Sequence, residues 1–146
     1  MDALSDPRDE SKWSADDLIS MGFLNTPELM ALLDDTPKLS ELDLEQFDAL
    51  VVCGEQSPMF TCCGRADLAR AIVAFYEAEK PTAVLCHGTC ALLDIKTSDG
   101  GTAARRQLHR WGLLRAFAVR DGNLIAGQQQ YSGAKVARLV IESLGV

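Results

Sequence analysis

One short segment of the sequence places a cysteine, a histidine and a glycine directly after an apolar run. Ala83–Leu85 is apolar, Cys86-His87-Gly88 follows, and Thr89–Leu93 favours a helix. A cysteine on a sharp turn between a strand and a helix projects from the sheet at the end of that strand. The N-terminus of the helix then favours the negatively charged thiolate. The pattern predicts that Cys86 is a nucleophile on a sharp strand-to-helix turn.

The cysteine content favours free thiols over a disulfide framework. The five cysteines are Cys53, Cys62, Cys63, Cys86 and Cys90. An odd number in an intracellular chain argues against structural disulfides. A disulfide between the adjacent Cys62 and Cys63 would be strained, but either thiol could resolve an oxidised Cys86. Because no CxxC pair occurs, we expect no metal site.

Composition predicts one globular domain without a bound cofactor. The chain has 146 residues, of which 47% are hydrophobic, enough to build a single core. We expect one domain over residues 1–146, with residues 1–14 irregular. The net charge of −7 argues against nucleic-acid binding, which needs a basic surface. Gly54, Gly88 and Gly127 do not form a phosphate-binding loop, so no nucleotide is implied.

The sequence predicts a cytoplasmic protein. The first twenty residues contain six acidic residues and no apolar core, unlike a signal peptide. No apolar run approaches the roughly 20 residues that a membrane-spanning helix needs.

Two apolar runs and one periodic segment predict the centre of the fold. Ala49–Cys53 and Ala83–Leu85 are continuous apolar runs, typical of strands buried on both faces. Arg65–Glu79, between them, has the apolar spacing of an amphipathic helix. The order strand, helix, strand favours a parallel crossover.

The flanking segments predict further helices and one hairpin. Ala116–Val119 and Leu124–Ala126 are separated by the turn residues Arg120–Asn123, which indicates a hairpin. Thr26 and Ser132 are expected to cap helices. The further helices are expected near residues 15–21, 27–33, 89–94, 103–111 and 133–144.

Three segments, in the right order, resemble the ThiJ/PfpI superfamily. Phe47–Gly54 resembles its strand and glycine turn, Lys80–Gly88 its nucleophile elbow, and Asp121–Gln128 its C-terminal hairpin. The N-terminal segment Trp13–Asp17 resembles the stress-response branch, which is associated with glyoxalase, deglycase and holding-chaperone activities. The resemblance implies an α/β fold, a flavodoxin-like three-layer sandwich with a mostly parallel sheet, in a protein that is usually homodimeric.

The resemblance also implies a catalytic site. Cys86 would be the nucleophile, with His87 beside it in the Cys-His pair of the family. The backbone amide of His87 and that of Gly54 or Glu55 would form an oxyanion hole. Two such donors aimed at one anion contribute a few kcal/mol to a transition state.

Two departures from the family pattern bear on this site. The family begins with a strand and a helix that supply a glutamate beside the cysteine, and this chain resembles a reduced version without that unit. Between Leu93 and Phe117 it has only a short, arginine-rich connection, where the stress-response branch carries an acid that orients the histidine. Loss of a base or an orienting group costs a nucleophile orders of magnitude in rate.

Glu55 is the available substitute for a missing carboxylate. It follows Gly54 where the family commonly has a second glycine. Near Cys86 it could take the role of the acid, or it could repel the thiolate and raise its pKa. Both readings stay open at this point.

Two classes of function are consistent with these residues. The first is a cysteine-dependent enzyme acting on a small carbonyl or amide substrate, glyoxalase-like or hydrolase-like, through the Cys86 thiolate. The alternative is a non-catalytic reduced family member that serves as a chaperone-like, binding or redox-sensing module. A sheet without the first unit exposes an edge, so we expect a homodimer or a partner chain to cover it.

Overall fold

The computed structural model describes residues 18–54, 57–93, 95–98 and 116–146. The chain divides into two compact units, Met1–Leu42 and Asp43–Val146, each described here by itself. The helix expected over residues 103–111 lies outside the described residues, as does Glu55. None of the described helices has the length and apolar character that a membrane crossing requires.

The described part of the first unit, residues 18–42, contains two short α-helices. Helix α1 spans Leu18–Leu24, and helix α2 spans Pro27–Met30 and continues as a 3-10 helix over Ala31–Leu33. Pro27 begins α2 as predicted. The expected cap is wrong: the Thr26 hydroxyl donates to the carbonyl of Gly22 (2.7 Å) and makes no capping bond to α2. A 3-10 turn over Leu39–Glu41 follows.

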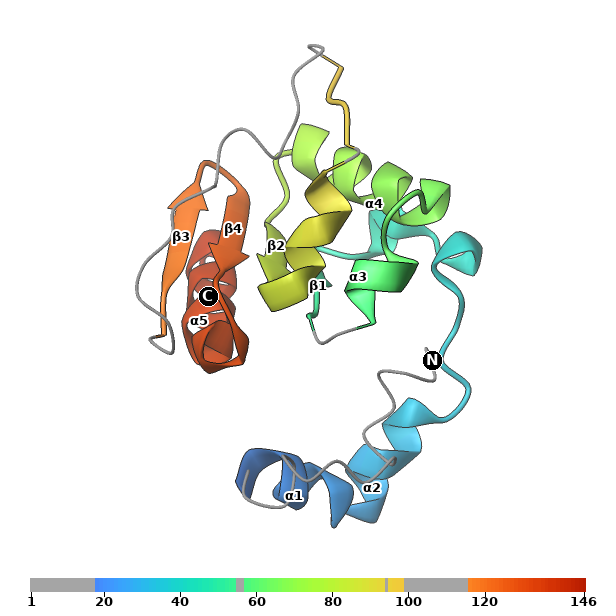
Figure 1. Ribbon diagram of the computed structural model, residues 1–146, viewed down its shortest axis with the longest axis vertical. Helices are drawn as coiled ribbons and strands as arrows, with labels where there is room; N and C mark the ends of the chain where they lie inside the picture. Colours follow the sequence, from blue (N-terminus) through green and yellow to red (C-terminus); the bar gives the residue numbers. More distant parts are fainter. Residues whose placement is uncertain (1–17, 55–56, 94, 99–115) are drawn as a thin grey trace. The chain divides into compact units, whose positions relative to one another are not determined.

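In the described residues of the second unit, four strands form a mostly parallel sheet in the order β1-β2-β4-β3 (Figure 1). Strands β1 (Leu50–Val52), β2 (Thr82–Leu85) and β4 (Leu124–Gly127) run parallel, and β3 (Ala118–Asp121) runs antiparallel to β4. The residues that form β1 and β2 are the two apolar runs of the sequence. The predicted α/β class is therefore confirmed.

Helices cover both faces of this sheet. Helix α4 (Ala66–Glu77) and the 3-10 helix η5 (Cys86–Leu92) pack on one face, and α5 (Gly133–Leu144) packs on the other. The side chains of β2 alternate between the two layers: Ala83 packs with α5, and Val84 packs with α4. This double burial explains the continuous apolar run, because a strand with two covered faces has no polar side.

Strand β1 differs from its prediction as a strand buried on both faces. Leu50 donates its backbone N–H to the carbonyl of Pro81 (2.9 Å), so the alternate residue Val51 directs its backbone groups to the outer edge. Within the described residues β1 pairs with β2 alone. The Val51 side chain is 48% exposed, which corrects the prediction for this strand.

The β3–β4 hairpin closes tightly. Its strands meet at Asp121 and Leu124 through the two-residue turn Gly122-Asn123, shorter than the four-residue turn predicted. Gly122 has φ 61°, a conformation that the first central residue of a type II′ turn needs and that glycine adopts without strain. The Asn123 amide donates to the carbonyls of Tyr76 (2.9 Å) and Lys80 (3.0 Å), and so it ties the hairpin to the end of α4.

Lys80, which lies shortly after the end of α4 at Glu77, is held by several contacts at the same end of the sheet. The Lys80 ammonium donates to the carbonyls of Phe47 (2.8 Å) and Glu45 (3.3 Å). It also lies 5.4 Å from the centre of the Phe75 ring. Lys80 therefore links α4 to the segment that leads into β1.

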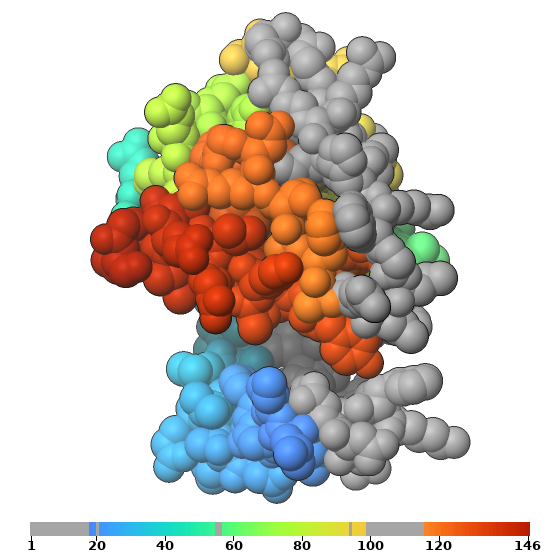
Figure 2. All heavy atoms as spheres, turned by 90° about the vertical axis from the view of Figure 1, so that its left-hand side faces the viewer, coloured from blue at the N-terminus to red at the C-terminus, as the bar shows by residue number. Residues whose placement is uncertain are grey.

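Helix α5 has the predicted bounds but not the predicted cap. The Ser132 hydroxyl makes no capping bond to α5 and accepts instead from the backbone N–H of Phe117 (3.1 Å). The helix ends at Gly145, whose φ of 75° is left-handed. Figure 2 shows α5 beside β3 on one face of the second unit.

A bidentate ion pair fastens the first turn of α4. The Arg65 guanidinium contacts both carboxylate oxygens of Asp67, at 3.0 and 2.7 Å, and Asp67 also accepts from the N–H of Leu68. These bonds favour the charged carboxylate, and the hydrogen bonds from Arg65 are the main cause that lowers the Asp67 pKa from 3.8 to about 2.

Replacing Asp67 with Asn should destabilise the protein near neutral pH and cease to matter in acid. Because the folded-state pKa is lowered, the stabilisation is present above about pH 4 and is lost as pH falls toward 2. Melting temperatures of both proteins across this pH range test the effect. Asp121→Asn, which removes an exposed charge elsewhere, is the control, and parallel pH profiles for all three proteins would contradict the prediction.

Candidate functional site

Cys86 stands on a strained turn at the carboxyl end of β2. Leu85, the last strand residue, is extended, with φ −126°, whereas Cys86 has φ 54°. A positive φ is uncommon for a residue with a Cβ and turns the chain sharply. Cys86 is half-buried, so its thiol is partly accessible from outside. The structure therefore has the strand-to-helix elbow that the sequence predicts.

The element after the elbow differs from the one expected. A helix was predicted near residues 89–94, but a seven-residue 3-10 helix begins at Cys86 itself. The Thr89 hydroxyl donates to the carbonyl of Cys86 (2.8 Å) and so fastens this first turn. Since the segment is short and not α-helical, a helix macrodipole contributes less to the thiol than the sequence suggested.

Two glycines hold the elbow against the end of β1. A Cβ on Gly54 would lie 2.5 Å from the Cβ of Cys86, and one on Gly88 would lie 2.5 Å from the carbonyl oxygen of Val52. The Cβ built on Gly54 would also lie 3.2 Å from the backbone nitrogen of His87. The structure thus brings together Cys86, His87 and Gly54, three of the residues predicted for the site.

Other predicted partners of the cysteine have different outcomes. The His87 side chain is exposed. Glu55 lies outside the described residues, so its role stays a prediction. Within the described part of the chain, no group of three or more His, Cys, Asp or Glu side chains is arranged to hold a metal ion.

Gln128 is a polar residue near the elbow that the sequence analysis did not include in the site. Leu85, the last residue of β2, pairs with Gly127, the last residue of β4. Cys86 and Gln128 therefore both follow the carboxyl ends of neighbouring strands. Its Oε1 atom is buried and has no hydrogen-bond partner among the described residues. A buried unpaired oxygen is costly and is often found where a site binds a ligand. In the sequence, Gln128–Tyr131 follows a strand end in the region that lies near the active site in the ThiJ/PfpI superfamily, but a loop before the last helix is the preferred interpretation of this segment.

Solved structures with the same fold fit this geometry, whereas no protein-family model and no curated protein matches the chain. The 24 kDa rapid encystment protein of Francisella tularensis superposes with a TM-score of 0.81 at 16% identity, over 88% of this chain and 72% of that one. Glyoxalase III of Candida albicans gives 0.77 at 16% identity, over 86% and 70% of the two chains.

A third structure carries the family name. The ThiJ/PfpI domain protein of Brachyspira murdochii superposes with a TM-score of 0.55 at 20% identity, over 73% of this chain and 65% of that one. The chain has the ThiJ/PfpI fold. The predicted flavodoxin-like architecture is confirmed with it.

Two further cysteines lie near the ThiJ/PfpI elbow. Helix α3 (Pro58–Thr61) packs against η5, and Cys62 follows α3 directly. Burial is the main cause that raises the pKa of the Cys62 thiol, a hydrogen bond with the Thr61 side chain opposes this rise, and the nearby Cys63 and Cys90 add to it. Cys63 itself is exposed. Their predicted role as redox partners of Cys86 stays a prediction.

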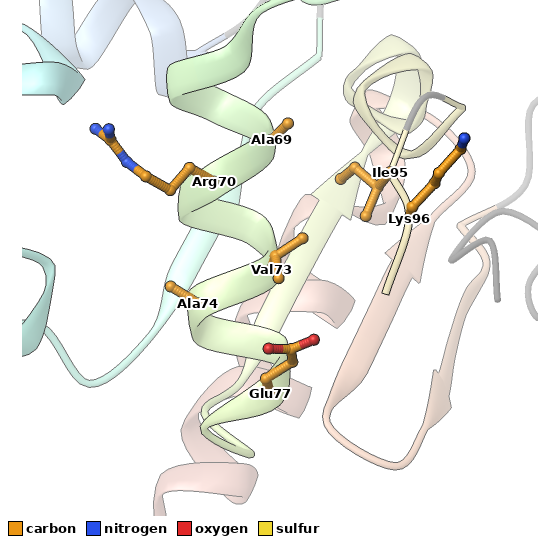
Figure 3. Close-up of a pocket in the computed structure, with 7 residues that line it drawn as sticks. All are labelled: Ala69, Arg70, Val73, Ala74, Glu77, Ile95 and Lys96. Atoms are coloured by element: carbon orange, nitrogen blue, oxygen red, sulfur yellow. The ribbon is translucent and has the colours of Figure 1, made fainter. Parts of the chain in front are cut away.

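A separate pocket of about 540 Å³ lies along α4 and is not part of the ThiJ/PfpI elbow. Figure 3 shows Ala69 and Val73 directed toward Ile95, whereas Arg70 and Lys96 point away from them. The Glu77 carboxylate at one end already accepts the N–H of Ser98 (2.9 Å). Its lining residues include no cysteine, serine or histidine, so this pocket is not the candidate active site.

Replacing Gly88 with Ala should destabilise the fold. The new methyl group would meet the carbonyl oxygens of Val52 (2.5 Å) and Cys53 (2.9 Å), which belong to backbone and cannot rotate away. We expect a loss of about 1–3 kcal/mol in the free energy of unfolding, measured by urea denaturation. Gly133→Ala is the control, because its methyl group would meet only Leu85 Cδ2 at 3.9 Å. Equal stability of the two variants would refute the close contact.

Proposed function

We propose that the protein is a cysteine-dependent enzyme that acts on a small carbonyl or amide substrate, in a glyoxalase-like or hydrolase-like reaction. The observation that carries this proposal is the φ of 54° at Cys86. Such strain costs about 1–3 kcal/mol and persists only where the surrounding structure enforces it. Gly54 and Gly88 supply that enforcement. Asp35 and Glu79 also have a positive φ, but of these three residues only Cys86 carries a thiol and directly follows a strand.

The chemistry begins with attack of the Cys86 thiolate on a carbonyl carbon. A new C–S bond forms, and the carbonyl π electrons move to oxygen. With an aldehyde, protonation of that oxygen gives a hemithioacetal. With an amide, the intermediate expels the amine and leaves an acyl-thioester, which water hydrolyses to restore the thiol. We propose that the backbone amides of Gly54 and His87 donate hydrogen bonds to the oxyanion.

Proton transfer needs a group that can change its charge state near Cys86. His87 is the adjacent candidate, because imidazole exchanges a proton near neutral pH. Glu55 is the second candidate. In the proposal one of them takes the proton of the thiol and returns it to the product.

The similarity to glyoxalase III supports the reaction class but does not identify a substrate. The two chains share a fold at 16% identity, and one fold serves many reactions. We place the protein in the cytoplasm, because all five of its cysteines are free thiols and a reducing compartment keeps them so.

A second candidate function is favoured by the exposed edge of β1. Val51, in this strand, is 48% exposed, and Phe47, just before it, is 43% exposed. An apolar edge strand is a template for pairing with another chain. We propose that a second copy of the protein covers it, and that a non-catalytic, chaperone-like or binding role would use the same edge.

Replacing Cys86 with Ser should abolish turnover of methylglyoxal. A serine hydroxyl is a far weaker nucleophile at neutral pH, so we expect a loss of at least about a thousandfold in kcat/KM. Cys63→Ser, which removes an exposed thiol outside the elbow, should retain activity. Undiminished turnover by the Cys86 variant would refute its role, and an inactive wild type would exclude this substrate.

Charging the edge of β1 should separate the two copies. Lysine at an exposed edge position disfavours strand pairing, so we expect the wild type to be a dimer and Val51→Lys to be a monomer by light scattering. Val146→Lys provides the matched control, since Val146 is 88% exposed at the C-terminus. A monomeric wild type at micromolar concentration would overturn the proposed dimer.

A further inference from the structure

Two cysteines, Cys62 and Cys90, belong to different segments of the chain that pack against each other. Helix α3 lies against η5 in the fold, and Figure 1 shows the two side by side. Cys62 follows the last residue of α3, and Cys90 lies within η5. The packing of these two elements therefore brings the segments that carry the two cysteines, far apart in the sequence, close together.

The side chain of Cys62 is turned into this contact. It packs against the buried cluster that includes Ala91 and Leu92, the two residues that follow Cys90. Burial is the main cause that raises the Cys62 pKa, and Cys90 is near enough to Cys62 to add to this rise, as Cys63 does. Both thiols are half-buried, so a small oxidant can reach them while the surrounding structure holds them together.

The neighbouring Cys63 is a poorer partner for Cys62. A disulfide between adjacent residues forces the backbone into a strained geometry. Cys63 is also exposed, whereas Cys62 faces the core. The geometry thus favours the partner across the contact over the partner in sequence.

We propose that Cys62 and Cys90 are a dithiol pair that a hydroperoxide oxidises to a disulfide. The site is separate from the elbow nucleophile and does not depend on the enzymatic proposal. It differs from the expectation that Cys62 or Cys63 would resolve an oxidised Cys86.

The reaction balances with the hydroperoxide as the only oxidant. The Cys90 thiolate attacks the terminal oxygen of the hydroperoxide, the O–O bond breaks, and an alcohol (water in the case of hydrogen peroxide) leaves with one proton. Cys90 is then a sulfenic acid. The Cys62 sulfur attacks the sulfur of Cys90, the S–S bond forms, and water leaves with the remaining proton. Two thiols are oxidised, and one peroxide is reduced.

The order of the two steps follows from the surroundings of the thiols. Cys62 packs against the buried core cluster, which restricts the approach of a peroxide to its sulfur. Cys62 therefore suits the second step, in which it resolves the oxidised partner. Formation of the disulfide joins the end of α3 to η5, the 3-10 helix that begins with Cys86.

The experiment maps the disulfide after treatment with one equivalent of hydrogen peroxide. Trypsin leaves Cys53, Cys62 and Cys63 in one peptide (residues 39–65), and it leaves Cys86 and Cys90 in another (residues 71–96). A cross-linked pair of peptides therefore shows that the two regions are joined, but variants are needed to identify the cysteines.

Single variants identify the pair. The wild type should lose two of its five free thiols and give the cross-linked peptides in a monomeric chain. Cys62→Ser and Cys90→Ser should abolish the cross-link, whereas the matched controls Cys63→Ser and Cys86→Ser should keep it. A cross-link that survives Cys90→Ser, or that disappears in Cys86→Ser, would overturn the proposal.

A triple variant gives an independent test. Replacement of Cys53, Cys63 and Cys86 by Ser leaves only the proposed pair. Peroxide should then consume both remaining thiols and form one intramolecular disulfide. The thermal midpoint should rise by roughly 5–10 °C on oxidation, because the cross-link restricts the unfolded chain. Persistence of both free thiols, or a disulfide between chains, would refute the pair.

Discussion

The fold around the candidate site depends on one close approach, in which the end of β1 touches the first turn of η5 with no side chain between them. Gly54 and Gly88 make this approach possible, because a methyl group on either would overlap the opposite segment. The contact leaves the chain little room between β2 and η5. Cys86 therefore takes a positive φ, and the strain of that residue is balanced by packing on both sides of it.

The two layers of helices give this small unit the rigidity to hold a strained residue. Strand β2 is buried on both faces, with Ala83 against α5 and Val84 against α4. A strand fixed in this way ends at a defined position, and the elbow begins where β2 stops. Gln128 reaches the same edge because β4 pairs with β2 in register. The site is thus assembled from strand ends that are neighbours in the sheet but distant in sequence.

Local patterns in the sequence predicted the central elements and the sharp turn at Cys86. The periodicity of α4, the apolar run of β2 and the cysteine at its end all depend on residues close together in the chain. Features that depend on distant contacts were not predictable in this way. Val51 is apolar like the residues of a central strand, yet it lies on an edge. The Ser132 hydroxyl suited a helix cap, but the backbone of Phe117 offered a donor from another element.

The contacts of Lys80 and Asn123 lie at the amino end of the parallel strands, opposite the elbow. There the ammonium and the amide join β1, α4 and the hairpin through main-chain carbonyls, which every residue possesses. The anchoring end of the sheet is therefore separate from the side chains around Cys86. Substitutions in the loops at the carboxyl end can leave these contacts at the amino end intact.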